Sequence, residues 1–286
     1  MVQCVTDKAA WFGEMKDQVS IPEKSDPLTF AVKERDQDVL KMVDEALSKN
    51  RGLLAFQPIV QAQRTNRPAY FEGLIRVCDP TGRVIPAKDF IADVEDTEVG
   101  RRIDCLALQL GLEALAEHPN LRLAINMSAK SIGFRPWNRV LNRSLRRDPT
   151  LGERLILEIT ERTAIVMPEV VQSFMADLQQ RGISFALDDF GAGYTAFRYL
   201  RDLYFDILKI DGEFIRGIHA SPDNQVLVRA LVGLARHFDM LTVAEFVQTE
   251  ADARTLVDMG IDCLQGYYFG RPTTQPVWRS SDSKIA

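Results

Sequence analysis

The stretch Ile183–Tyr194, ISFALDDFGAGY, decides the fold class of this chain because it joins a buried strand to a pair of acids. Its apolar run, Ile183–Leu187, is too short for a helix and predicts a buried strand. Asp188 and Asp189 follow this run, and the two glycines after them let the chain bend so that both carboxylates face one opening. Adjacent carboxylates repel each other unless a cation lies between them, which favours a divalent metal site. The alternative is a turn whose acids cap a helix that begins near Thr195.

Composition and charge narrow the class of protein further. The chain has 286 residues, 46% of them hydrophobic and 26% charged, which is typical of a soluble globular protein with one large domain or two smaller ones. The net charge of −5 argues against a nucleic-acid polymer as partner, because such binding needs a basic surface. The net charge does not exclude an anionic small molecule as a ligand, since bound metal ions can reverse the local field. The sequence shows no signal peptide and no stretch of membrane-spanning length, so we expect no membrane insertion and a cytoplasmic location.

Cysteine and histidine do not indicate a metal site of their own. The four cysteines are scattered without a C-x-x-C pair, which fits buried thiols in a reducing compartment better than disulfides or zinc. The three histidines are equally dispersed, and we interpret them as surface or helix-end residues.

Strand and helix patterns alternate along most of the chain. The apolar runs that predict strands are Leu53–Val60, Tyr70–Val77, Leu121–Ile125, Leu155–Ile159, Ile183–Leu187, Phe205–Ile210, Leu241–Ala244 and Ile261–Leu264. Helical patterns are predicted from Asp36 to about Asn50, over Phe90–Ala116, over Val170–Leu178, from Ser221 to about His237, and over Thr249–Met259. This alternation predicts parallel β/α units of an α/β protein. Eight strand candidates suit a closed (β/α)8 TIM-like barrel better than an open doubly wound sheet, and no G-x-G-x-x-G motif follows the first strand.

Three segments divide the chain. Residues 1–35 show no clear period and predict a leader or linker, residues 36–275 form the domain, and residues 276–286 predict a flexible tail.

Polar side chains gather where the predicted strands end. They are Glu72, Asn126, Glu158, Asp188, Asp189, Lys209, Glu245 and Gln265. In a β/α barrel the carboxyl ends of the strands share one face, and active sites are built there. Oxygen ligands without cysteine or histidine suit hard cations, so the sequence predicts a site for Mg²⁺ or Mn²⁺.

Several ordered motifs resemble the EAL-domain family of bacterial cyclic di-GMP phosphodiesterases. They are FQPIV at Phe56–Val60, EGLIR at Glu72–Arg76, AINMSA at Ala124–Ala129, LEITE at Leu157–Glu161, LDDFGAGY at Leu187–Tyr194, DILKID at Asp206–Asp211, VAE at Val243–Glu245 and LQGYYF at Leu264–Phe269. The resemblance runs from about Ala55 to Pro272, which is most of the chain.

The resemblance implies an activity and roles for individual residues. It implies hydrolysis of cyclic di-GMP to linear pGpG by a two-metal mechanism with Mg²⁺ or Mn²⁺, in a protein that forms a homodimer. The implied metal ligands are Glu72, Asn126, Glu158, Asp188, Asp189 and Glu245. The implied catalytic residues are Lys209, Glu245 and Glu72, with Gln57, Arg76, Asp211 and Gln265 binding substrate. Glu161 is implied to support the loop after Asp189.

The sequence departs from the family pattern at several places. Gly73 stands where the name-giving motif has alanine, Val77 where tryptophan is usual, and AEFVQ replaces AEGVE, with Phe246 for glycine and Gln248 for glutamate. We expect these changes to reduce or retune activity. An alternative is therefore a degenerate EAL module that acts as a cyclic di-GMP receptor or protein-interaction module without catalysis. A glycerophosphodiesterase-like barrel is disfavoured because no histidine lies near the strand ends.

Overall fold

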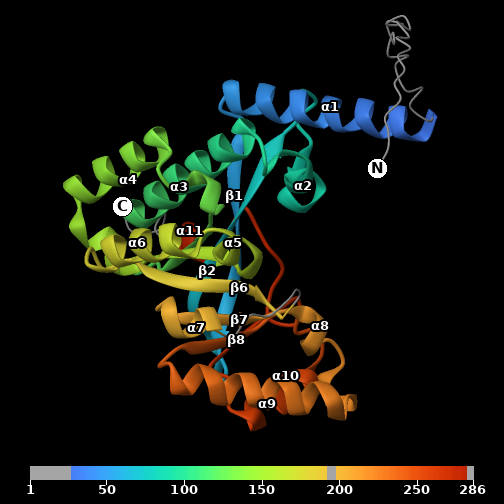
Figure 1. The fold of residues 1–286 in the computed structure, drawn as a ribbon, viewed down its shortest axis with the longest axis vertical. Helices are drawn as coiled ribbons and strands as arrows, with labels where there is room; N and C mark the ends of the chain where they lie inside the picture. The colour runs from blue at the N-terminus through green and yellow to red at the C-terminus, as the bar shows by residue number, and fades with distance from the viewer. Residues whose placement is uncertain (1–26, 192–197, 282–286) are drawn as a thin grey trace, which may run out of the picture.

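All of the apolar runs predicted as strands belong to one sheet in the computed structural model, which describes residues 27–191 and 198–281 (Figure 1). The strands are β1 (Gly52–Gln61), β2 (Arg64–Cys78), β4 (Leu123–Asn126), β5 (Leu155–Thr160), β6 (Ser184–Phe190), β7 (Ile207–Ile210), β8 (Leu241–Ala244) and β9 (Cys263–Gln265). The sheet runs in the order β1-β9-β8-β7-β6-β5-β4-β2, and a further pairing of β1 with β2 closes it. The predicted α/β fold with a (β/α)8 TIM-like barrel is confirmed. A short strand that was not predicted, β3 (Val84–Pro86), pairs with β2 outside the barrel.

The first strand corrects the expectation of parallel units throughout. β1 is antiparallel to both of its neighbours, β2 and β9. Parallel neighbours need a crossover of about a dozen residues or more, whereas only Ala62 and Gln63 separate β1 from β2. A tight hairpin is the connection that so short a link allows. From β4 to β9 the strands are parallel.

Two layers of side chains point into the barrel. The lower layer is mainly apolar and consists of Ile59, Tyr70, Ala124, Ile156, Ala186, Ile207, Val243 and Cys263. Because side chains alternate along a strand, residues two positions away on each strand point inward as well. In the parallel strands these are the polar residues of the predicted site, and on antiparallel β1 the corresponding residue is Gln57, which pairs with Glu72. The alternation thus places one polar ring directly above one apolar ring.

Helices cover the outside of the barrel (Figure 1). Their bounds are α1 (Pro27–Ser48), α2 (Ile91–Val94), α3 (Glu98–Glu117), α4 (Arg135–Arg147), α5 (Glu161–Val166), α6 (Pro168–Gln179), α7 (Arg198–Asp202), α8 (Gly212–Ile215), α9 (Pro222–His237), α10 (Glu250–Met259) and α11 (Val277–Ser281). Local signals set several ends. Ser221 caps α9 by accepting a hydrogen bond from Asn224 N, and Thr249 caps α10 by accepting one from Asp252 N. Gly260, with φ of 82°, ends α10.

Other helix boundaries differ from the sequence predictions. The first helix begins at Pro27 rather than Asp36. The predicted helix over Phe90–Ala116 is broken into α2 and α3, because Thr97 caps α3 by accepting a hydrogen bond from Val99 N at 3.1 Å. Helix α4 was missed, although Trp137 and other large apolar residues bury one of its faces.

Residues 276–286, predicted from the sequence as a flexible tail, include helix α11 (Val277–Ser281). Thr273 and Phe56 exchange two backbone hydrogen bonds, of 2.8 and 3.1 Å. Helix α11 follows, and the Trp278 ring packs edge-on against Phe56 and Phe71, with ring centroids 5.0 and 5.9 Å apart. The segment from Thr273 to Trp278 is therefore bound to β1 and β2. Among the described helices, none combines the length and the apolar character needed to cross a lipid bilayer.

Candidate active site

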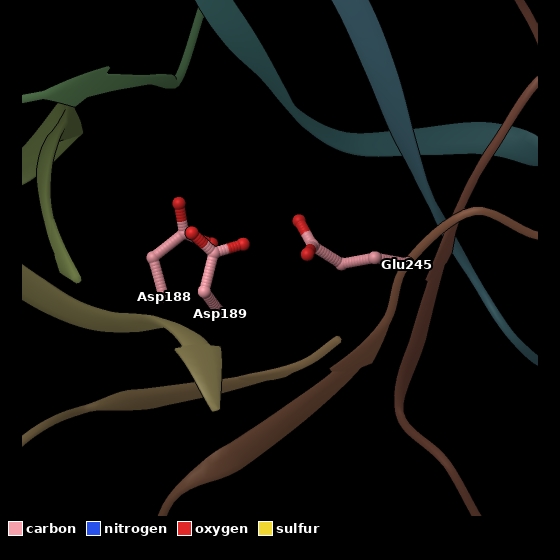
Figure 2. Close-up of side chains that lie close together, drawn as sticks. All are labelled: Asp188, Asp189 and Glu245. Atoms are coloured by element: carbon pink, nitrogen blue, oxygen red, sulfur yellow. The ribbon is translucent and has the colours of Figure 1, made fainter. Parts of the chain in front are cut away.

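Three carboxylates meet at the carboxyl ends of β6 and β8 (Figure 2). One oxygen each of Asp188, Asp189 and Glu245 can be chosen so that all lie within 4.8 Å of one another. Neighbours on a regular strand point to opposite faces, so Asp188 and Asp189 can share a mouth only if the backbone departs from the strand. It does so at Asp189, whose φ is 54°. Aspartate tolerates this left-handed conformation better than most residues do. The prediction that the carboxylates of Asp188 and Asp189 face one opening is confirmed.

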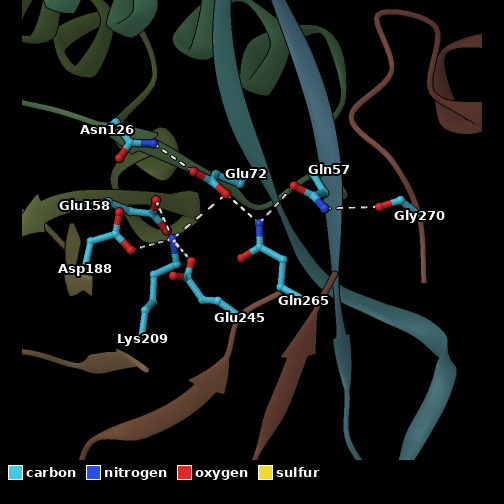
Figure 3. Close-up of polar contacts among 9 residues, drawn as sticks. All are labelled: Gln57, Glu72, Asn126, Glu158, Asp188, Lys209, Glu245, Gln265 and Gly270. Carbon is cyan, nitrogen blue, oxygen red and sulfur yellow. Dashed lines mark hydrogen bonds and ion pairs between the residues drawn. The ribbon is translucent and has the colours of Figure 1, made fainter. Parts of the chain in front are cut away.

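Lys209 lies at the centre of the polar ring (Figure 3). Its Nζ is 2.8 Å from Asp188 Oδ1, 2.9 Å from Glu245 Oε1 and 3.0 Å from Glu158 Oε2. Glu72 Oε2 is farther away, at 3.9 Å. The lysine side chain is only 1% exposed. One buried cation thus faces four carboxylates, three from β2, β5 and β6 and one from the residue directly after β8.

Amide side chains hold the other half of the ring (Figure 3). Asn126 Nδ2 donates to Glu72 Oε1 at 2.8 Å, and Gln265 Nε2 donates to Glu72 Oε2 at 2.5 Å. Gln265 Nε2 also lies 3.3 Å from Gln57 Oε1, and Gln57 Nε2 donates to the Gly270 carbonyl at 3.1 Å. Both oxygens of Glu72 are therefore held from neighbouring strands.

The charges of the ring are out of balance. Burial by itself would lower the pKa of Lys209, but the surrounding carboxylates raise it well above its ordinary value, so the ammonium stays charged. Burial also opposes ionisation of Glu72, yet Lys209 and the amide hydrogen bonds hold its pKa below the ordinary value. For Glu245, burial and the nearby acids outweigh Lys209 and raise the pKa to about 8. Burial and Asp188 raise the pKa of Asp189 to about 6. A single lysine does not neutralise this many acids.

The donor set fits hard divalent cations. Besides the carboxylate cluster, Glu158 Oε1 and Gln265 Oε1 are buried oxygens that receive no hydrogen bond from the described residues. Buried polar atoms without a partner are costly, and an ion or water is the usual partner. An all-oxygen site with excess negative charge is what Mg²⁺ or Mn²⁺ prefers.

The remaining predicted site residues lie around the ring rather than in it. Half-buried Arg76 donates to the Ile75 carbonyl at 2.9 Å and makes no ion pair with the ring within the described chain. Asp211 caps α8 by accepting a hydrogen bond from Glu213 N at 2.7 Å. The proposed substrate contacts of these two residues remain predictions.

Glu161 has a contact that agrees with its implied role. It is buried, and its Oε2 accepts a hydrogen bond at 3.0 Å from the backbone N of Gly191, two residues after Asp189. The rest of the loop, 192–197, and the helix start suggested near Thr195 lie outside the described residues.

One residue of the barrel interior was not singled out from the sequence. Tyr70 lies two residues before Glu72 on β2, and its buried hydroxyl has no hydrogen-bond partner among the described residues. Burial raises its pKa well above the ordinary value, which keeps it a hydrogen-bond donor. The alternation of β2 was the signal that could have placed it under the ring.

Fold and site together define a closed α/β barrel protein with a cluster of carboxylates at the carboxyl ends of its strands. The chain belongs to the EAL domain family, whose model matches residues 40–272. It is 32% identical over 238 residues to cyclic di-GMP phosphodiesterase PdeB of Shewanella oneidensis, covering 80% of this chain and 27% of that protein. It is 31% identical over 238 residues to cyclic di-GMP phosphodiesterase PdeF of Escherichia coli, covering 82% and 32%.

A solved structure shows the same fold. The PaMucR phosphodiesterase in complex with c-di-GMP superposes with a TM-score of 0.72 at 30% identity, covering 85% of this chain and 99% of that one. The chain spans only 27% and 32% of the length of the two curated relatives above.

Proposed function

We propose that this protein is a cyclic di-GMP phosphodiesterase that hydrolyses cyclic di-GMP to linear pGpG with two divalent cations, Mg²⁺ or Mn²⁺. The observation that carries the proposal is the convergence of Asp188, Asp189 and Glu245 beside the buried Lys209. Similarity to the phosphodiesterases above supports the substrate class. The domain that we assign to this activity is residues 36–275.

The proposed cations would be held by six residues. They are Glu72, Asn126, Glu158, Asp188, Asp189 and Glu245. When bound, two such cations supply a water of lowered pKa and neutralise charge on the phosphate under attack. Lys209 would contribute a fixed positive charge next to these ligands, and because its side chain is buried, electrostatic stabilisation there would be strong.

Other side chains of the proposed site would orient the nucleotide. Arg76 would bind a phosphate, and the hydrogen-bonded pair Gln57 and Gln265 presents fixed amides at the mouth of the barrel. Asp211 would contribute a further substrate contact. Glu161 would hold the start of the loop after Asp189 through Gly191.

A second function, nucleotide binding without turnover, is favoured by one observation. Lys209 forms ion pairs with Asp188, Glu158 and Glu245, so a side chain of the protein itself balances part of the negative charge of the ring. A receptor that does not cleave its ligand could keep such a site.

The test is incubation of the purified protein with cyclic di-GMP and Mg²⁺ or Mn²⁺, followed by chromatographic separation of the products. We expect linear pGpG to accumulate, and EDTA to stop its formation until metal is restored. Asp188→Asn serves as the inactive control, because it removes a proposed ligand with little change in volume. Nucleotide binding in Ca²⁺ without any product in Mg²⁺ or Mn²⁺ would favour the receptor. Full turnover after rigorous chelation would refute the two-metal mechanism.

A further inference from the structure

Phe246, the residue that directly follows Glu245, has an unusual backbone conformation. Its φ is 54°, and the other non-glycine residues with positive φ in the described chain are Asn50, Asp189 and Asp239. Asparagine and aspartate tolerate the left-handed region, whereas a bulky aromatic residue there is an outlier. Such strain persists only when the surrounding structure imposes it.

The contacts of the Phe246 ring identify what holds it. A Cβ atom added at Gly212 would lie 2.4 Å from Phe246 Cδ2, so the ring rests directly on a glycine backbone. Arg216 Cζ lies 4.3 Å from the ring centroid, in cation–π geometry. Gly212 begins α8, and Arg216 directly follows it. The ring is therefore clamped on the helix that comes after the Lys209 strand.

The backbone on either side of Phe246 is bound as well. Glu245 N donates to the Ile210 carbonyl at 3.2 Å, and Val247 N donates to the Gln265 carbonyl at 2.9 Å. The Val247 carbonyl in turn accepts a hydrogen bond from Tyr268 N at 3.2 Å. The turn after β8 is thus fixed to the ends of β7 and β9.

We propose that Phe246 is a positioning residue for Glu245. By seating its ring between Gly212 and Arg216, it sets the turn after β8 and so aims the Glu245 carboxylate at Asp188 and Lys209. This inference rests on the proposed metal site. It differs from the expectation from sequence that phenylalanine in place of glycine at position 246 reduces or retunes activity, because here the ring supports the site. Glycine at position 246 would relax the backbone, but it would remove the aromatic ring that joins the β8 turn to α8.

The test measures Mn²⁺ binding by isothermal titration calorimetry on the full chain, independently of turnover. Phe246→Ala removes the ring and keeps the left-handed strain, whereas Phe246→Gly removes both. Phe246→Tyr restores the ring, and Arg216→Met removes only the cation–π contact. Tyr268→Ala is the matched control for loss of an aromatic ring, because Tyr268 has the same 46% exposure as Phe246. Asp239→Gly is the control for relief of a positive φ, since its φ is 57°.

We expect the Ala and Gly variants of Phe246 to weaken Mn²⁺ binding about 10-fold, the size typical for residues that orient metal ligands. Phe246→Tyr should bind as the wild type does, Arg216→Met should lie between, and the two controls should not change Mn²⁺ affinity. Thermal melts would confirm that every variant is folded, and because Phe246 and Arg216 are exposed at the surface we expect them to be. Wild-type affinity in both the Ala and Gly variants would overturn this proposal. Absence of Mn²⁺ binding by the wild type would instead refute the proposed metal site on which it rests.

Discussion

Removing the positive charge of Lys209 should destabilise the metal-free protein strongly. In Lys209→Met the side chain keeps its approximate volume and loses the ammonium that lies 2.8–3.0 Å from Asp188, Glu245 and Glu158. Because the lysine is 1% exposed, solvent cannot replace it. Removing one partner of a buried ion pair costs about 3–5 kcal/mol, since it leaves buried charge uncompensated.

This loss should be visible in thermal unfolding. For a chain of this size about 1 kcal/mol corresponds to a shift of roughly 2–4 °C, so the melting temperature in EDTA should fall by about 6–20 °C. Added Mn²⁺ should recover part of the loss, because a cation bound only to the folded state stabilises it by about 2.7 kcal/mol at 100 times its dissociation constant. Differential scanning calorimetry in EDTA and in Mn²⁺ measures both effects.

A surface lysine provides the matched control. Lys130 pairs with Asp96, and both side chains are largely exposed. Lys130→Met should therefore change the melting temperature little with or without metal, because exposed ion pairs contribute little to stability. If the free energy of unfolding of Lys209→Met in EDTA lay within about 1 kcal/mol of the wild-type value, Lys209 would not be the group that neutralises the ring.

Three further predictions concern other parts of the molecule. Glu72→Ala should abolish most turnover, whereas Arg76→Ala should mainly raise KM. Steady-state kinetics measure both effects. If Arg76→Ala changed neither KM nor kcat, the proposed phosphate contact of Arg76 would be excluded. Burial raises the pKa of Asp104 to about 7, so the folded state retains a proton that the unfolded chain releases near pH 4. The free energy of unfolding should therefore fall as pH rises from about 4 to about 7, by up to about 1.4 kcal/mol per pH unit. Denaturant melts at several pH values measure this slope. The same slope in Asp104→Asn as in the wild type would contradict the prediction. The homodimer implied by the family should appear in sedimentation velocity, and a fully active monomer would remove the dimer from the mechanism.

The sequence by itself determined the positions of the eight barrel strands and most of the polar residues at their ends. Alternation and short apolar runs are local properties, so β4–β9 and the polar residue near the carboxyl end of each of them could be located without coordinates. The same holds for the helix ends at Ser221 and Gly260, because a cap depends on residues within one turn. The short link after Gln61 even contained the information that β1 and β2 form a hairpin, although the repeating pattern suggested otherwise.

The tertiary structure decided what distant segments do to one another. The residues around Trp278 showed no sequence pattern that predicted a helix. In the structure the Trp278 ring packs on Phe56 and Phe71, which come from the opposite end of the sequence. In the sequence Phe246 is a departure from the family pattern that we expected to reduce or retune activity, and in the structure Gly212 and Arg216 hold its ring. Packing and charge interactions act between side chains that the fold brings together from distant parts of the sequence, so local sequence patterns could not reveal them.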